Sequence, residues 1–159
     1  MKTLQINEKD ARRLYKTASA EFKQVLEDTF GKEFFTGSVL DRVNTYEDAL
    51  AATGQPDVTN FGDVPTKYVP FFRAMWRNVM IVEALNDGEQ MDIYDSDKRR
   101  YYPYFACNNG PSGFAFYDSY FGSSDADAGS GSRLSLKDLD RAVHYGKKFT
   151  GEIRDMLTK

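Results

Sequence analysis

The chain has 159 residues and a formal net charge of −3, with 21 lysines and arginines against 24 aspartates and glutamates. A chain of this length can bury enough apolar surface to fold as one domain, and its single cysteine, Cys107, excludes an intramolecular disulfide. The acidic balance argues against non-specific nucleic-acid binding, because proteins that bind phosphate backbones usually carry a basic surface.

The first fifty residues are patterned as a series of short helices. Asn7, Ser19 and Thr45 each precede apolar residues at helical spacing. Each has a side chain that accepts hydrogen bonds from free amides in a first helical turn, so each is expected to cap a helix. Gly31 and Gly54 follow two of these segments and are expected to end them, as glycine often does.

A central helix is predicted over residues 66–86, after a loop over residues 55–65 that is rich in proline, glycine and polar residues. Apolar residues surround much of this helix, which indicates packing on more than one side. Arg73, Arg77 and Glu83 interrupt the apolar run, so a core helix is expected and not a membrane span. The first residues lack the apolar core of a signal peptide, which favours a cytoplasmic protein.

An aromatic hairpin is predicted where YYPYFA (101–106) and FAFY (114–117) flank the turn residues NNGPS (108–112). Side chains alternate between the two faces of a strand. Phe114 and Phe116 are therefore expected to cover the helices, while Tyr102 and Tyr117 point outward. Tyr104 shares the face of Tyr102, so the outer face is expected to be rich in tyrosine.

The last part of the chain is predicted to hold a loop over 122–132, a short third strand over 133–136 and a final amphipathic helix capped by Asp138. Gly146 is expected to let this helix approach the central helix near Met75 and Val79, with Val143 and Phe149 in the contact. Together these elements indicate one α+β domain over 1–159, mostly helical, with a small antiparallel sheet and a long C-terminal helix.

The segment GFAF (113–116) matches the centre of an RNA-binding octapeptide, K/R-G-F/Y-G/A-F-V-x-F/Y. The basic, valine and final aromatic positions of that pattern are occupied here by Ser112, Tyr117 and Ser119. No first strand precedes the hairpin, as the RNA-recognition fold would require. We therefore interpret the segment as hairpin packing.

No metal, cofactor or catalytic residue is predicted. The segment 125–129 begins like a calcium loop but lacks the later ligands, and the acidic residues of 92–97 adjoin the basic residues 98–100. His144, the single histidine, falls on the polar face of the final helix, where a solvated side chain is expected. An enzyme that uses carboxylates alone stays open.

Four segments in chain order resemble one family: LYKTASAEFKQVLEDTFGKEFF (14–35), TYEDALAATG (45–54), YYPYF (101–105) and GSRLSLKDLDRAVHYGKKF (131–149). The family comprises small uncharacterised proteins from gut Bacteroidales and their phages. The resemblance implies a mobile-element context and a location in the bacterial cytoplasm or the virion. It implies no activity, cofactor or site residue.

The leading hypothesis is a non-catalytic binding or accessory protein of a phage or mobile element, which contacts a host or phage macromolecule such as a defence component. A protein partner is expected, without membrane or nucleic acid, and the oligomeric state is not predicted. An aromatic face that binds a small ligand or single-stranded nucleic acid is the alternative. The candidate binding residues are Tyr102, Tyr104, Tyr117, Tyr120, Arg99, Arg100 and Arg133.

Overall fold

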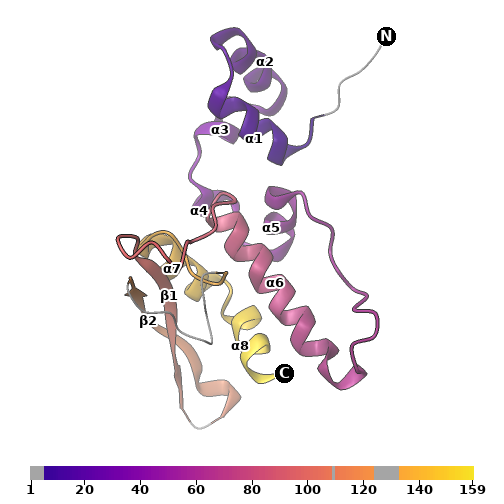
Figure 1. Ribbon diagram of the computed structural model, residues 1–159, viewed down its shortest axis with the longest axis vertical. Coiled ribbons are helices and arrows are strands. Elements are labelled where there is room, and N and C mark those ends of the chain that lie inside the picture. Colours follow the sequence, from indigo (N-terminus) through magenta and orange to yellow (C-terminus); the bar gives the residue numbers. More distant parts are fainter. Residues whose placement is uncertain (1–5, 109, 124–132) are drawn as a thin grey trace.

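Helices occupy the chain as far as Leu85, and a hairpin and two further helices follow (Figure 1). The computed structural model describes residues 6–108, 110–123 and 133–159. Two short 3-10 turns, Thr66–Tyr68 and Pro111–Gly113, accompany the regular elements. The helices and strands, in chain order, are α1 (Glu8–Thr17), α2 (Ala20–Phe30), α3 (Lys32–Thr36), α4 (Val39–Arg42), α5 (Tyr46–Thr53), α6 (Val69–Leu85), β1 (Arg100–Cys107), β2 (Phe114–Gly122), α7 (Leu139–Lys148) and α8 (Thr150–Thr158). The predicted α+β class is confirmed.

The helix ends follow the predicted capping residues. Asn7, Ser19 and Thr45 each accept a hydrogen bond from a backbone amide in the first turn of α1, α2 and α5. Gly31 and Gly54 end α2 and α5 with φ values of 86° and 65°, which glycine adopts without a Cβ clash. Local sequence therefore determines where these helices start and stop.

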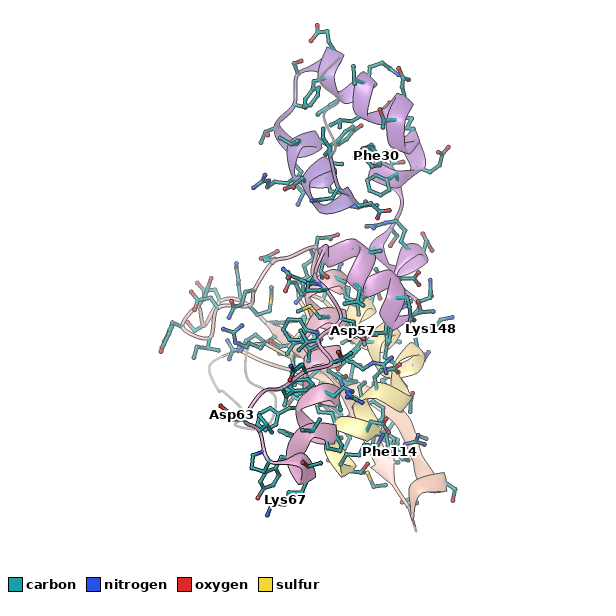
Figure 2. The ribbon with its side chains drawn as sticks, turned by 90° about the vertical axis from the view of Figure 1, so that its right-hand side faces the viewer. Phe30, Asp57, Asp63, Lys67, Phe114 and Lys148 are labelled. Carbon is teal, nitrogen blue, oxygen red and sulfur yellow. The ribbon has the colours of Figure 1, made fainter. Side chains whose placement is uncertain are left out.

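The helices α1, α2 and α3 form a small lobe at one end of the molecule, which we call the N-terminal lobe (Figure 1). Aromatic rings fill it: Tyr15 stacks on Phe35 at 4.2 Å between ring centroids, and Phe30 packs against Phe34 at 5.2 Å. Figure 2 shows Phe30 between the helices of the lobe. Contacts between α1 and α5 join the lobe to the remaining helices.

The main core surrounds α6. Helices α5 and α8 pack against α6, and in Figure 1 α8 lies between α6 and the hairpin. Ile81, Leu85, Leu136, Tyr145 and Phe149 are among its most buried side chains. The predicted final helix is divided at Phe149, whose φ of −112° and ψ of 26° interrupt the helical geometry between α7 and α8. In the described part of the chain, none of the helices has the length and apolarity needed to cross a bilayer.

The predicted contact between Gly146 and the central helix is wrong. A Cβ placed on Gly146 would overlap the ring of Phe116 and lie 2.9 Å from the Cβ of Pro103, so this glycine faces the hairpin. The break at Phe149 explains the difference, because α7 and α8 take different partners. Helix α8 covers α6, while α7 packs mainly on β1 and β2.

The sheet is two-stranded and antiparallel, with Tyr102 paired with Tyr120 and Phe105 paired with Phe116. The predicted third strand is reduced to one bridge, in which Leu136 exchanges two backbone hydrogen bonds with Tyr101 at 2.9 and 2.7 Å. Most of the predicted loop over 122–132, including the segment 125–129, lies outside the described residues.

Candidate functional site

Four tyrosines share the outer face of the hairpin, and for three of them, Tyr102, Tyr104 and Tyr117, the alternation predicts this direction. We call this set, Tyr102, Tyr104, Tyr117 and Tyr120, the tyrosine face. Tyr102 pairs with Tyr120 across the strands, and the ring of Tyr104 meets that of Tyr120 edge-on at 5.3 Å. Tyr104, Tyr117 and Tyr120 are 54%, 68% and 46% exposed, while Tyr102 is half-buried. Large amphipathic rings are thus presented to solvent side by side.

A β-bulge explains why Tyr117 projects furthest. Tyr104 pairs with Asp118 and the next residue, Phe105, pairs with Phe116, so Tyr117 is the extra residue of β2. A bulge twists its strand and changes the direction of the side chain that it carries. Tyr117 and Asp118 are both exposed, whereas Phe116 before them is partly buried. The extra residue shifts the alternation along β2, so that Asp118 and Tyr120 lie on the outer face as well, opposite Tyr104 and Tyr102.

The opposite face of the hairpin packs against the helices. Phe114 stacks on Phe105 at 4.6 Å and contacts the core, and Phe116 meets the same ring at 6.1 Å and packs on Gly146. Figure 2 shows Phe114 where the hairpin meets the helices. The predicted orientation of Phe114 and Phe116 is confirmed, although both are only partly buried. The GFAF segment is therefore not an open platform for stacking bases.

The predicted arginines are engaged in contacts other than with the four tyrosines. The guanidinium of Arg99 lies over the ring of Phe121 at 4.5 Å. Arg100 is 4% exposed, and its Nη1 donates a hydrogen bond to the backbone oxygen of Asp92 at 3.4 Å. Arg133 is exposed and lines a separate cavity of about 240 Å³. The structure therefore brings the four tyrosines together, while Arg99 and Arg100 make other contacts at the start of β1 and Arg133 lines a separate cavity.

A second feature lies between the N-terminal lobe and the body, where arginines surround a cavity of about 510 Å³. We call it the arginine cleft and define it by Arg12 of α1, Arg42 of α4 and Arg141 of α7, around Asp87. Asp87 follows α6 and has a φ of 54°. Its carboxylate lies 3.7 Å from Arg42 Nη2 and 3.3 Å from Arg141 Nη2. Lys137 Nζ, also 3.3 Å away, is a third cation on this one carboxylate.

The arginines of this cleft occupy an electrostatically costly environment. Burial and the neighbouring guanidinium of Arg42 lower the pKa of Arg12 to about 10. Burial also lowers the pKa of Arg42, although Asp87 partly offsets this effect. Both remain protonated at neutral pH. Their Nε atoms are buried without a hydrogen-bond partner among the described residues. Buried charged donors without acceptors are costly, so the cleft is suited to receiving an anion.

Sequence reasoning missed the arginine cleft because its members come from helices that are distant in the chain. Arg12, Arg42 and Arg141 belong to no linear motif, and each resembles an ordinary surface cation in its own helix. The available signal was the turn sequence Asn86-Asp87-Gly88, which follows the end of α6. That turn indicates a tight backbone conformation and carries no information about which cations will meet Asp87.

The expectation of a solvated His144 is wrong. Its Nε2 lies 2.7 Å from the backbone oxygen of Val43, and its ring lies 6.2 Å from that of Phe149. The sequence pattern indicates that this face of α7 is polar and solvated. Val43, in the segment that follows α4, instead contacts it at His144. Within the described ranges, no group of three or more histidine, cysteine or acidic side chains is arranged to hold a metal ion.

No protein-family model matches this chain, and neither a curated protein nor a solved structure matches it. The resemblance to proteins of gut Bacteroidales and their phages stays a prediction. The two surface features described above are therefore interpreted from their own geometry.

Proposed function

We propose that this protein is a non-catalytic binding protein that contacts a partner protein through the tyrosine face. The observation that carries the proposal is the division of the hairpin into two aromatic faces. The inner face is used in packing against α7, while the outer face presents Tyr104, Tyr117 and Tyr120 at 46–68% exposure. Contiguous exposed aromatic surface of this kind is typical of interaction sites.

The chemistry of the tyrosine face favours a protein over a nucleic acid. Tyrosine offers a large rigid ring and a polar tip, and it is enriched in protein interfaces. The charge opposite Tyr104 is the carboxylate of Asp118, which would repel phosphates. Single-strand binders instead combine stacking rings with cations, and here Arg100 is buried while Arg99 lies on Phe121.

The sequence resemblance supports a partner that is a host or phage macromolecule, such as a host defence component. It supports action in the bacterial cytoplasm, with the virion as the other location. The proposal of a non-catalytic role is supported by the sequence, in which no recognisable nucleophile, base or phosphate-binding motif occurs. Binding alone would then account for the function, as it does for proteins that block or recruit another macromolecule.

The test compares capture by three forms of the protein from phage-infected cells. The forms are the wild type, the double variant Tyr104→Ala/Tyr117→Ala, and the variant Tyr94→Ala. Tyr94 is 89% exposed and lies outside the tyrosine face, so it controls for the loss of an exposed tyrosine. We expect one protein to be retained by the wild type and by Tyr94→Ala and lost by the double variant.

Binding of the purified partner should then be measured directly for the three forms. An affinity for the double variant at least about tenfold weaker than for the wild type is expected, because hot-spot tyrosines each contribute roughly 2 kcal/mol or more. Equal affinity for all three forms contradicts the proposal. Because both side chains are exposed, the double variant should remain folded. Circular dichroism and denaturant melts check this.

A further inference from the structure

We propose that the arginine cleft is a binding site for the phosphate group of a small organic phosphate. This inference is independent of the tyrosine face and of its partner. It begins from the charge of the cavity. Arg12, Arg13, Lys16, Arg42 and Arg141 line it, against two acidic residues, Glu83 and Asp87. A chain with a net charge of −3 thus concentrates cations at one concave site.

Several cations of the cleft share the carboxylate of Asp87, although Glu8 also faces Arg12 and Arg42, and Asp138 pairs with Arg141. One carboxylate faces the guanidinium groups of Arg42 and Arg141 and the ammonium of Lys137. The distance of 3.7 Å between Arg42 Nη2 and the carboxylate of Asp87 is that of an ion pair and is too long for a hydrogen bond. A second anion at this point would lie among several N–H donors from different helices.

Arg12 and Arg42 line the cavity, and each has a buried Nε that no described protein group accepts from. The guanidinium of Arg12 lies on the ring of Phe34 at 3.6 Å, which holds it in place while its Nε has no partner in the described part of the chain. The Nε of Arg42 is buried in the same way. Planar guanidinium groups match phosphate oxygens in pairs, and such charge-assisted bonds are among the strongest in proteins.

The size and walls of the cavity indicate that the phosphate carries an organic group. About 510 Å³ is larger than one phosphate needs and lies within the range of small-molecule sites. Tyr15 and Phe35 line the cavity and are stacked on each other, so an aromatic wall stands beside the cations. A nucleotide-sized ligand could place a ring on this wall and its phosphate among the arginines.

A second cationic cavity lies between α6 and α8, and its Arg77 also has a buried Nε without a partner in the described part of the chain. The carboxylates of this cavity form ion pairs with its own cations: Glu152 with Arg77 at 3.7 Å, and Asp155 with Lys159 at 2.7 Å. Arg154 lines that cavity and is half-exposed. This cavity supplies a matched control, because a change at Arg154 removes an arginine from a cationic surface without touching the arginine cleft.

The experiment is titration calorimetry of the intact protein with two probes, inorganic phosphate and adenosine monophosphate. Both should bind the wild type, and the nucleotide should bind more tightly if the aromatic wall contributes. The variant Arg42→Gln should bind either probe at least about tenfold more weakly, which corresponds to the loss of one charge-assisted hydrogen bond. Arg154→Gln should bind like the wild type.

A second measurement does not depend on any variant remaining folded. In NMR spectra of the wild type, adenosine monophosphate should shift the backbone amide signals of Gly37, Ser38 and Gly88, which line the cleft. Absence of binding by both probes at millimolar concentration overturns the proposal. Shifts confined to residues near Arg73 and Arg154 also overturn it, as does equal affinity of a folded Arg42→Gln variant. None of these outcomes bears on the tyrosine face, whose test uses other residues.

Discussion

The ring of Phe116 lies directly against Gly146, and the contact leaves no space for a side chain on α7 at this position. Two elements meet here that are distant in sequence, the second strand of the hairpin and the first half of the split C-terminal helix. Pro103 of β1 also lies against Gly146, so both strands of the hairpin pack on this glycine. The outward direction of the tyrosine face depends on this inner contact.

Replacement of Gly146 by alanine should therefore destabilise the protein. The added methyl group must displace the ring of Phe116 or the side chain of Pro103 in β1. Overpacking of this kind costs about 1–3 kcal/mol, while alanine regains up to about 1 kcal/mol of helix propensity. We expect a net loss of about 1–2 kcal/mol of unfolding free energy in urea melts.

Gly151→Ala is the matched control. Gly151 lies in α8, and among the described residues no atom of another element comes within 4 Å of the position that its new methyl group would take. This change should be neutral or stabilising by up to about 1 kcal/mol. If Gly146→Ala were as stable as Gly151→Ala, the hairpin would not pack on α7 as described.

The two faces of β2 should respond differently to alanine. Phe116→Ala removes a ring that packs on α7 and should cost about 1–3 kcal/mol, less than a fully buried phenylalanine because the ring is only partly covered. Tyr117→Ala removes a ring that is 68% exposed and should change stability by less than about 0.5 kcal/mol. Guanidinium chloride melts of both variants measure the difference. A larger loss for Tyr117→Ala than for Phe116→Ala would reverse the assignment of the faces.

The features that sequence predicted are those set by neighbouring residues. Asn7, Ser19 and Thr45 cap helices through bonds to amides only a few positions away, and strand alternation needs no knowledge of distant residues. For the same reason the tyrosine face could be predicted before its surroundings were known. The bulge that brings Tyr120 onto this face could not, because a bulge is a property of strand register.

The features that sequence missed depend on which element packs on which. The break at Phe149 assigns α7 to the hairpin and α8 to α6, and no periodicity in the two helices distinguishes these partners. His144 becomes half-buried because Val43 lies over it. The arginine cleft requires three helices to converge on Asp87, which is a tertiary arrangement without a local signature.

Phe149→Ala should cause the largest loss of stability among single core truncations of this region. The ring is 1% exposed and lies at the junction of α7 and α8, within 6.1 Å of the ring of Tyr145. Large-to-small changes at such positions cost about 3–5 kcal/mol. Leu157→Ala, at a position 61% exposed in α8, is the control and should stay within about 0.5 kcal/mol of the wild type in the same denaturant melts. A loss below about 1 kcal/mol for Phe149→Ala would mean that the side chain is not in the core.

The cap of α5 should make stability depend on pH through Asp48. Burial opposes ionisation of this carboxyl, but hydrogen bonds from the backbone and side chain of the Asn44–Thr45 segment overcome it and lower its pKa below the ordinary 3.8. Its Oδ2 accepts from the amides of Asn44 at 3.0 Å and Thr45 at 2.9 Å. Because the folded state holds the carboxylate more strongly than the unfolded state does, the contribution is complete above pH 3.8. It is lost as the pH falls through the lowered pKa.

Asp48→Ala should therefore be less stable than the wild type by about 1 kcal/mol at neutral pH, a typical value for the loss of a capping interaction. The difference in unfolding free energy between the two proteins should shrink as the pH falls below 3.8, because the carboxyl of the unfolded state is protonated first and that of the folded state follows at its lowered pKa. Asp63→Ala, which removes an exposed carboxylate of the loop before α6, controls for the general effect of one negative charge and should stay within about 0.5 kcal/mol of the wild type at neutral pH. A difference for Asp48→Ala that stays constant down to acidic pH would show that the cap acts without its charge.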